Sequence, residues 1–135
     1  MRVTGLNHYN LRAHQPLLDE LCRFYVEIVG LSVGDRPQFA VAGYWLYANG
    51  HPVLHLAEAS AAENATTEIG GTFAHAAFDC VDVASAETLL TLRGIRYRKT
   101  AVPESGAPQI FFTDPAGNGV ELLFPAAEDS RSTPK

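Results

Sequence analysis

An internal repeat, weak in identity and clear in layout, limits the folds that this 135-residue chain can adopt. His75 follows His8 by 67 positions, and apolar residues recur at three- and four-residue spacing after each histidine. Such spacing predicts a helix with one apolar face. The predicted helices cover about 15–29 and 84–93. A glycine follows each of them and can adopt the left-handed conformation that ends a helix.

Three segments with the turn boundaries of strands follow each predicted helix. They cover about 32–37, 43–48 and 52–57 in the first half, and about 96–102, 109–113 and 119–124 in the second. With a further strand before each helix, the sequence predicts two β-α-β-β-β modules. One helix for every four strands favours the α+β class, with mostly antiparallel sheets that each carry a helix on one face.

The predicted modules cover about 4–58 and 72–125 within a single domain that spans 1–135. Between them lies a segment rich in Ala, Thr, Asn and Glu, about 59–71, which we expect to be a flexible linker. The polar tail, 126–135, is expected to be flexible too, because chain ends fray unless packing holds them.

Four polar residues occupy equivalent places in the two modules: His8 and His75 on the first strands, and His55 and Glu121 on the last. Each has apolar neighbours, and burial of an unpaired carboxylate is costly. Modules that face each other would bring all four side chains together. Imidazole and carboxylate suit Fe, Mn, Co, Ni or Zn better than Ca or Mg, so the pattern predicts a divalent metal site. Taken singly, a strand histidine is more often a hydrogen-bonded core residue.

Asn10, Trp45, Tyr47 and Phe111 are the predicted substrate-binding residues. Asn10 lies two positions after His8, so the two share one face of a strand. Trp45 and Tyr47 also share a face, and they could stack on an aromatic substrate. Packing under the helix is an equal alternative for this pair, and the same ambiguity holds for Phe111.

Charge and hydropathy exclude several classes of partner. The net charge is −5, and no run of lysine or arginine offers a surface for nucleic acid or an anionic membrane. No apolar run reaches the roughly 18 residues of a transmembrane helix, and the N-terminus lacks the apolar stretch of a signal peptide. We therefore expect a cytoplasmic protein in which Cys22 and Cys80 are buried thiols rather than a disulfide.

Four motifs give the sequence its resemblance to the vicinal oxygen chelate superfamily. They are GLNH at 5–8, FYVEIVGL at 24–31, AHAAF at 74–78 and DPAGNGVEL at 114–122. The superfamily includes glyoxalase I, extradiol ring-cleaving dioxygenases, methylmalonyl-CoA epimerase, and fosfomycin and bleomycin resistance proteins. The resemblance covers about 6–124 and implies an open, U-shaped, mostly antiparallel sheet around a metal cleft. It also implies His8, His55, His75 and Glu121 as ligands, and a homodimer, sometimes with modules paired across chains.

The resemblance leaves several chemistries open. In the one that we favour, His8, His75 and Glu121 hold Fe(II) or Mn(II), and a catechol and O2 take the three open positions, as in the ring-cleaving dioxygenases. His55 is then the acid–base. In the second, all four residues bind the metal, with Ni(II), Zn(II) or Co(II) among the candidates. Two positions remain for the substrate of a glyoxalase I-like lyase or isomerase, and proton transfer falls largely on Glu121.

Two further readings stay open beside these. One is an epimerase of the same superfamily. The other is a small-molecule binding protein of the bleomycin-resistance type, which is disfavoured because such proteins as a rule lack the metal residues. All four hypotheses include a small molecule as substrate or ligand. The dioxygenase, the lyase or isomerase and the epimerase also require neighbouring oxygens on that molecule.

Overall fold

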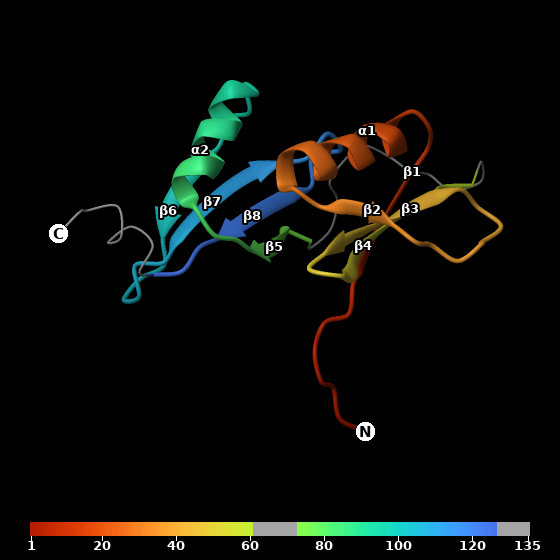
Figure 1. Ribbon diagram of the computed structural model, residues 1–135, viewed down its shortest axis with the longest axis horizontal. Coiled ribbons are helices and arrows are strands. Elements are labelled where there is room, and N and C mark those ends of the chain that lie inside the picture. The colour runs from red at the N-terminus through yellow and green to blue at the C-terminus, as the bar shows by residue number, and fades with distance from the viewer. Residues whose placement is uncertain (61–72, 127–135) are drawn as a thin grey trace. The chain divides into compact units, whose positions relative to one another are not determined.

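The computed structural model describes residues 1–60 and 73–126, which form two compact units of the same topology (Figure 1). Unit 1 comprises Met1–Glu68 and unit 2 comprises Ile69–Lys135. The predicted linker, 59–71, and the predicted tail, 126–135, lie almost entirely outside the described residues. Within the described part of the chain, no helix is long and apolar enough to cross a membrane.

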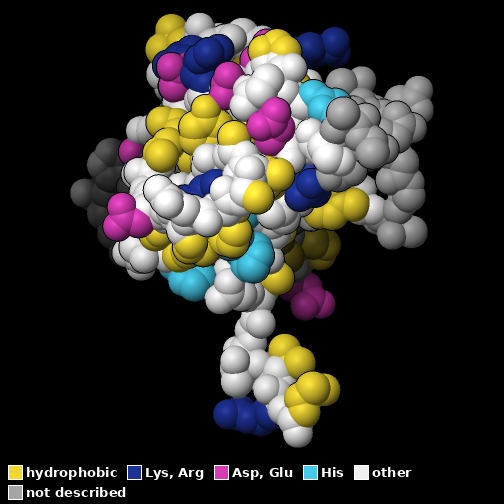
Figure 2. All heavy atoms as spheres, turned by 90° about the vertical axis from the view of Figure 1, so that its right-hand side faces the viewer, with side chains coloured by type: hydrophobic (Ala, Val, Ile, Leu, Met, Phe, Trp, Pro, Cys, Tyr) yellow, Lys and Arg dark blue, Asp and Glu magenta, His cyan; other side chains and the backbone are white. Residues whose placement is uncertain are grey.

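Unit 1 is a four-stranded sheet with one helical segment. Its elements are β1 (Tyr9–Ala13), α1 (Leu17–Phe24), a π-helical turn η1 (Tyr25–Val29), β2 (Ser32–Gly34), β3 (Gly43–Ala48) and β4 (His51–Glu58). The strand order is β1-β4-β3-β2, with β1 parallel to β4 and the other neighbours antiparallel. The residues before β1 form an extended segment that leads away from the sheet (Figures 1 and 2).

Unit 2 repeats this arrangement. Its elements are β5 (His75–Asp79), α2 (Val83–Leu92), β6 (Arg98–Ala101), β7 (Pro108–Thr113) and β8 (Gly119–Leu123). The strand order is β5-β8-β7-β6, and again only the first pair is parallel. The predicted α+β class, with two β-α-β-β-β modules and mostly antiparallel sheets, is therefore confirmed.

The core of unit 1 lies between its helical segment and one face of its sheet. Helix α1 lies against β1, β3 and β4, and the sheet contributes three leucines with no exposed surface, Leu46, Leu54 and Leu56. The helical segment contributes Leu18, Leu21, Tyr25 and Ile28. The predicted single helix over 15–29 is found as α1 followed by η1. It begins after Pro16, which lacks an amide hydrogen, and ends at Gly30 with a φ of +91°.

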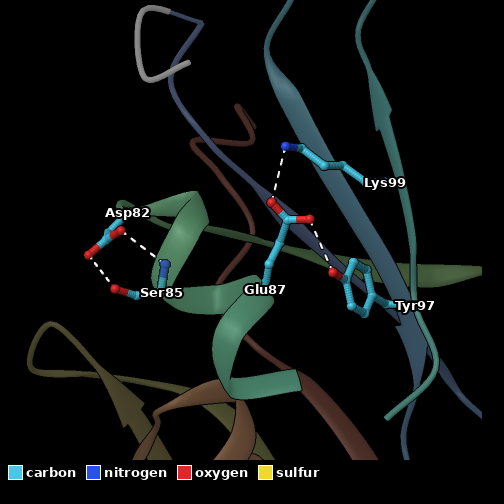
Figure 3. A network of polar contacts seen from close by, with 5 residues as sticks. All are labelled: Asp82, Ser85, Glu87, Tyr97 and Lys99. Atoms are coloured by element: carbon cyan, nitrogen blue, oxygen red, sulfur yellow. Dashed lines mark hydrogen bonds and ion pairs between the residues drawn. The ribbon is translucent and has the colours of Figure 1, made fainter. Parts of the chain in front are cut away.

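Helix α2 is held at its start and in its middle by charged side chains (Figure 3). The Asp82 carboxylate caps the helix by accepting a hydrogen bond from the Ser85 amide at 3.1 Å, and the Ser85 hydroxyl donates to it as well. The Glu87 carboxylate accepts hydrogen bonds from the Tyr97 hydroxyl and the Lys99 ammonium, both at 3.1 Å. The two contacts of Glu87 tie α2 to β6 and to Tyr97 just before it.

The two cysteines are thiols, as predicted, but both are half-buried rather than buried. Cys22 lies on α1 beside the Asp19 carboxylate, and Cys80 directly follows β5. Burial is the largest cause of the raised pKa of the Cys22 thiol, and the Asp19 charge adds to it. A raised pKa keeps the thiol protonated and makes it a poor nucleophile.

Candidate functional site

The sheet face of unit 1 that points away from α1 carries three candidate residues side by side. His55 on β4 is in register with Asn10 on β1 and with Trp45 on β3. Because Leu54 and Leu56 point to the helix, alternation along β4 directs His55 to the opposite face. The indole of Trp45 stacks on the imidazole of His55, with ring centroids 4.1 Å apart and planes at 10°.

His8 covers the other side of the His55 ring. The two imidazoles are stacked with centroids 3.8 Å apart and planes at 14°. The sequence placed His8 on the first strand, whereas the structure places it one residue before β1, in the exposed extended segment. Its Nδ1 lies 2.7 Å from the side-chain oxygen of Asn7. The main-chain carbonyl of Asn7 is 3.0 Å from Nε2 of His51, and this contact fixes the segment against the start of β4.

The environment of His55 favours its neutral form. Burial is the largest cause of its lowered pKa, the charge of His8 adds to the effect, and a backbone hydrogen bond to Pro52 opposes it. Nε2 of His55 is buried and has no hydrogen-bond partner among the described residues. The bond to Pro52 therefore uses Nδ1 as the donor, which leaves a lone pair on Nε2 in the neutral ring. This lone pair can accept a proton or bind a metal ion.

A cavity of about 200 Å³ opens beside His55. Its walls carry two guanidinium groups and two aromatic rings, and it is lined by Asn10, Arg12, Arg36, Phe39, Val41, Trp45, His55, Leu56 and Ala57. We call it the unit 1 cavity. Tyr47 is not among its lining residues: the register of β3 shifts between Leu46 and Tyr47, and the Tyr47 hydroxyl donates a hydrogen bond to the carbonyl of Asp35 at 2.6 Å.

Unit 2 brings His75 and Glu121 together. His75 opens β5, and Glu121 is a buried residue of β8 with an exposed fraction of 6%. Nε2 of His75 lies 3.0 Å from Oε1 of Glu121. The other carboxylate oxygen, Oε2, accepts a hydrogen bond from the Gln109 amide at 3.2 Å, and the Thr100 hydroxyl donates to Oε1 of Gln109 at 3.1 Å. Both oxygens of the buried carboxylate therefore have partners.

Gln109 is a residue of the candidate site in unit 2 that the sequence did not indicate directly. A signal was present, since Gln109 lies two positions before Phe111 and so shares its face of β7, next to Glu121 on β8. Phe111 lies edge-on to the His75 ring, with centroids 5.6 Å apart and planes at 78°. The guanidinium carbon of Arg98 sits 4.6 Å from the centroid of the Phe111 ring. Phe111 therefore packs beside the His75–Glu121 pair.

The turn before β8 determines where Glu121 lies. The buried Asp114 carboxylate accepts hydrogen bonds from the amides of Ala116 and Asn118, both at 2.9 Å, and from the Asn118 side chain at 3.0 Å. β8 then begins at Gly119, where a Cβ would meet the Ala74 carbonyl oxygen at 2.2 Å. Only glycine allows β5 to approach this closely, so the DPAGNG motif positions the His75–Glu121 pair through its turn.

The His75–Glu121 pair fits a divalent metal ion. Nε2 and Oε1 lie 3.0 Å apart, the length of a hydrogen bond, and an imidazole nitrogen and a carboxylate oxygen are both atoms that a divalent ion accepts as ligands, so the pair could hold an ion. Among the described residues, no group of three or more His, Cys, Asp or Glu side chains lies close enough together to hold an ion. Each pair, His8 with His55 and His75 with Glu121, is therefore at most part of a ligand set.

Comparisons with known proteins identify the family. Residues 5–122 match the profile of the Glyoxalase/Bleomycin resistance protein/Dioxygenase superfamily, whereas no curated protein matches the sequence. Similar solved structures include a glyoxalase family protein from Bacillus anthracis, with a TM-score of 0.71, 21% identity, and 93% of this chain and 98% of that chain covered.

Two others show how varied these relatives are. Lactoylglutathione lyase from Agrobacterium tumefaciens has a TM-score of 0.67 and 20% identity, with 93% and 97% covered. An antibiotic-binding protein from a Streptomyces species has a TM-score of 0.65 and 20% identity, with 93% and 98% covered. At such identities these structures share the fold alone. Together with the profile match, the two repeated units place this chain in the Glyoxalase/Bleomycin resistance protein/Dioxygenase superfamily.

Proposed function

We propose that the protein is a metal-dependent enzyme that acts on the vicinal oxygens of a small aromatic substrate, as the ring-cleaving dioxygenases of the superfamily do. His8, His75 and Glu121 are the proposed ligands, and Fe(II) or Mn(II) is the proposed ion. When bound, the ion would act as a Lewis acid toward two neighbouring substrate oxygens and leave a position for O2. A cytoplasmic homodimer is part of this proposal.

The observation that carries it is the stacking of His8 on His55. An imidazole binds a metal ion through a lone pair that lies in the plane of its ring. With the two planes at 14° and the centroids 3.8 Å apart, an ion in the plane of one ring lies well outside the plane of the other. The stacked arrangement therefore supports one ligand from this pair rather than two, and a ligand set of two histidines and one carboxylate.

His8 is the better ligand of the stacked pair and His55 the better acid–base. His8 is exposed and lies on the extended segment before β1, so its ring can turn toward an ion. His55 is confined between Trp45 and His8 and lines the unit 1 cavity, and its buried Nε2 has no hydrogen-bond partner among the described residues. From there Nε2 can take the proton of a substrate hydroxyl and later return it.

The second candidate is a glyoxalase I-like lyase or isomerase, in which all four residues hold the ion. It is favoured by the same unpartnered Nε2, since that lone pair would suit a fourth ligand if the His8 ring turned away from the stack. An epimerase would use a similar set. The family also contains proteins that bind small molecules, and the similar antibiotic-binding protein supports a binding protein as a further candidate.

Metal content and His55→Ala distinguish these candidates. After anaerobic reconstitution with Fe(II), Mn(II), Ni(II) and Zn(II), we expect stoichiometric Fe(II) or Mn(II), loss of the ion in Glu121→Ala, and O2 uptake with catechol. For His55→Ala we expect retained metal and lost turnover. Loss of metal in that variant would favour the four-ligand enzyme, and no stoichiometric metal at all would favour a binding protein.

The matched control is His14→Ala. His14 is an exposed histidine at the far end of β1 from His8, with Tyr9–Ala13 between them. It should change neither metal content nor O2 uptake. His8→Ala should lose the ion, because it removes a proposed ligand. Equal metal content in the His8→Ala and His14→Ala variants would remove His8 from the ligand set.

A further inference from the structure

We propose that the unit 1 cavity binds a carboxylate carried by the substrate, and that the substrate is a single-ring aromatic acid. The inference deepens the proposed function and rests on it for the vicinal oxygens. It stands on three features of the cavity: its size, a fixed guanidinium with an unused donor, and the absence of acidic side chains among its lining residues.

The size of the cavity suits one substituted ring. Its volume is about 200 Å³, and an apolar cavity of about 150 Å³ is large enough to hold benzene. The difference leaves room for one small substituent. Two aromatic side chains, Trp45 and Phe39, line it, with ring centroids 6.2 Å apart. A planar ring placed against either of them gains stacking as well as burial.

Arg36 is held in place by its surroundings. Its guanidinium carbon lies 4.8 Å from the centroid of the Phe39 ring, and Nη2 donates a hydrogen bond to the carbonyl of Val41 at 3.1 Å. On the other side it abuts the backbone of Gly43, where a Cβ would stand 2.9 Å from Nη2. A guanidinium fixed by three contacts is preorganised, so a ligand does not have to order it on binding.

The donor that Arg36 leaves unused points to an anion. Its Nε is buried and has no hydrogen-bond partner among the described residues. A buried N–H without an acceptor is unfavourable, and a carboxylate oxygen would supply the acceptor with the added strength of opposite charge. A ring without an acceptor would leave this donor unsatisfied, and a neutral acceptor would satisfy it without the added strength of opposite charge.

The net charge around the cavity favours the same ligand. Arg12 provides a second guanidinium, Asn10 provides an amide, and none of the described lining residues is an aspartate or a glutamate. Arg36 is also close enough to His55 to contribute to the lowered pKa of that imidazole. A bound carboxylate would compensate the positive charge of Arg36.

The fluorescence of Trp45 tests the proposal directly, because Trp45 is the only tryptophan in the sequence and lines the cavity. Metal-free full-length protein is titrated with benzoate and with benzamide, which have the same ring and size and differ in charge. Benzamide can also accept a hydrogen bond from Arg36, but without the charge, so we expect benzoate to bind about five- to tenfold more tightly, the difference between a charged and a neutral hydrogen bond. Arg36→Met should remove that preference, and Arg36→Lys should keep part of it.

Arg23→Met is the matched control, since it removes the same charge from an exposed position on α1, on the other side of the sheet. It should leave the benzoate preference intact. Circular dichroism verifies that each variant folds, and if Arg36→Met does not, the Arg36→Lys titration decides.

Equal binding of benzoate and benzamide, or a preference that survives Arg36→Met and is unchanged in Arg36→Lys, would overturn the carboxylate site. These titrations need no metal, so their failure is separate from that of the proposed function. If O2 uptake with catechol is observed without a preference for benzoate, the proposed enzyme activity stands and only the proposed carboxylate on its substrate is refuted.

Discussion

Replacement of Gln109 by leucine should destabilise the protein and weaken metal binding together, because this amide supports the buried Glu121 carboxylate. Gln109 donates to Oε2 at 3.2 Å, and Glu121 has an exposed fraction of only 6%, so water cannot readily replace the lost donor. A hydrogen bond to a charged group contributes about 1.5–3 kcal/mol. Leucine has nearly the size of glutamine and fills the same space without donating.

Urea denaturation of the metal-free protein measures the first effect. With a denaturant dependence of about 2 kcal/mol per molar, a loss of about 2 kcal/mol lowers the urea midpoint by about 1 M. Calorimetric titration with Mn(II) measures the second effect, and loss of a group that orients a ligand typically weakens metal binding about 10–100-fold. Both effects should be seen in Gln109→Leu, since one hydrogen bond causes both.

Thr100→Val is the control for this prediction. It removes the hydroxyl that donates to the Gln109 carbonyl oxygen at 3.1 Å and leaves the bond from Gln109 to Glu121 in place. Its effect on the urea midpoint should be less than half of that of Gln109→Leu. An unchanged midpoint in Gln109→Leu, or unchanged Mn(II) affinity beside a lowered midpoint, would refute the view that this amide supports a metal-binding carboxylate.

Three further predictions concern the scaffold. Tyr44→Phe should lower the free energy of unfolding by about 1–2 kcal/mol in urea, because the Tyr44 hydroxyl donates to Asp19 at 2.6 Å, a bond that is the largest cause of its raised pKa of about 12. Asp114→Ala should cost about 2–4 kcal/mol, since three donors lose their acceptor, and Asp114→Asn should cost less. Hydrogen bonds from the first turn of α2 lower the pKa of Asp82 below its unfolded value, so its stabilisation is present at neutral pH and is lost as the pH falls below about 4. Thermal melts across that range should show a smaller acid destabilisation in Asp82→Asn.

The internal repeat made it possible to predict the fold from the sequence. Its offset of 66 to 67 positions predicted that His55 and Glu121 are equivalent, and the registers agree: His55 pairs with Asn10 and Trp45, and Glu121 pairs with Ala77 and Phe111. Period-two alternation then decides the face of each side chain. The repeat and the alternation are both visible in the sequence itself, which is why pattern alone could supply them.

The contacts that complete the candidate site could not be predicted from the repeat or from the alternation. The stacking of His8 on His55 depends on the path of the extended segment before β1, which no periodicity describes. Arg36 lies in the connection between β2 and β3, and its position depends on Phe39 and Gly43. Such loop contacts are set by tertiary packing rather than by spacing in the sequence.

The two units hold different side chains at one register position, and exchange of a single residue tests the division of roles that we propose. In unit 2 the β8 position holds Glu121, whose oxygens are both bonded, whereas in unit 1 the equivalent β4 position holds His55 beside the unpartnered Nε of Arg36. His55→Glu would bring a carboxylate into the cavity that Arg36 lines. We expect the introduced carboxylate to pair with the Arg36 guanidinium, so that it occupies the place proposed for the carboxylate of the substrate.

Benzoate should then bind no better than benzamide to His55→Glu, as in Arg36→Met, although Arg36 is still present. His55→Gln is the control, because it removes the imidazole without adding charge and should keep the preference for benzoate. If His55→Glu keeps that preference as well, the carboxylate at this position does not reach Arg36. The guanidinium of Arg36 would then act independently of the residue at the β4 position. This result would refute the proposal that unit 2 supplies an acidic ligand and unit 1 a site for an acidic substrate.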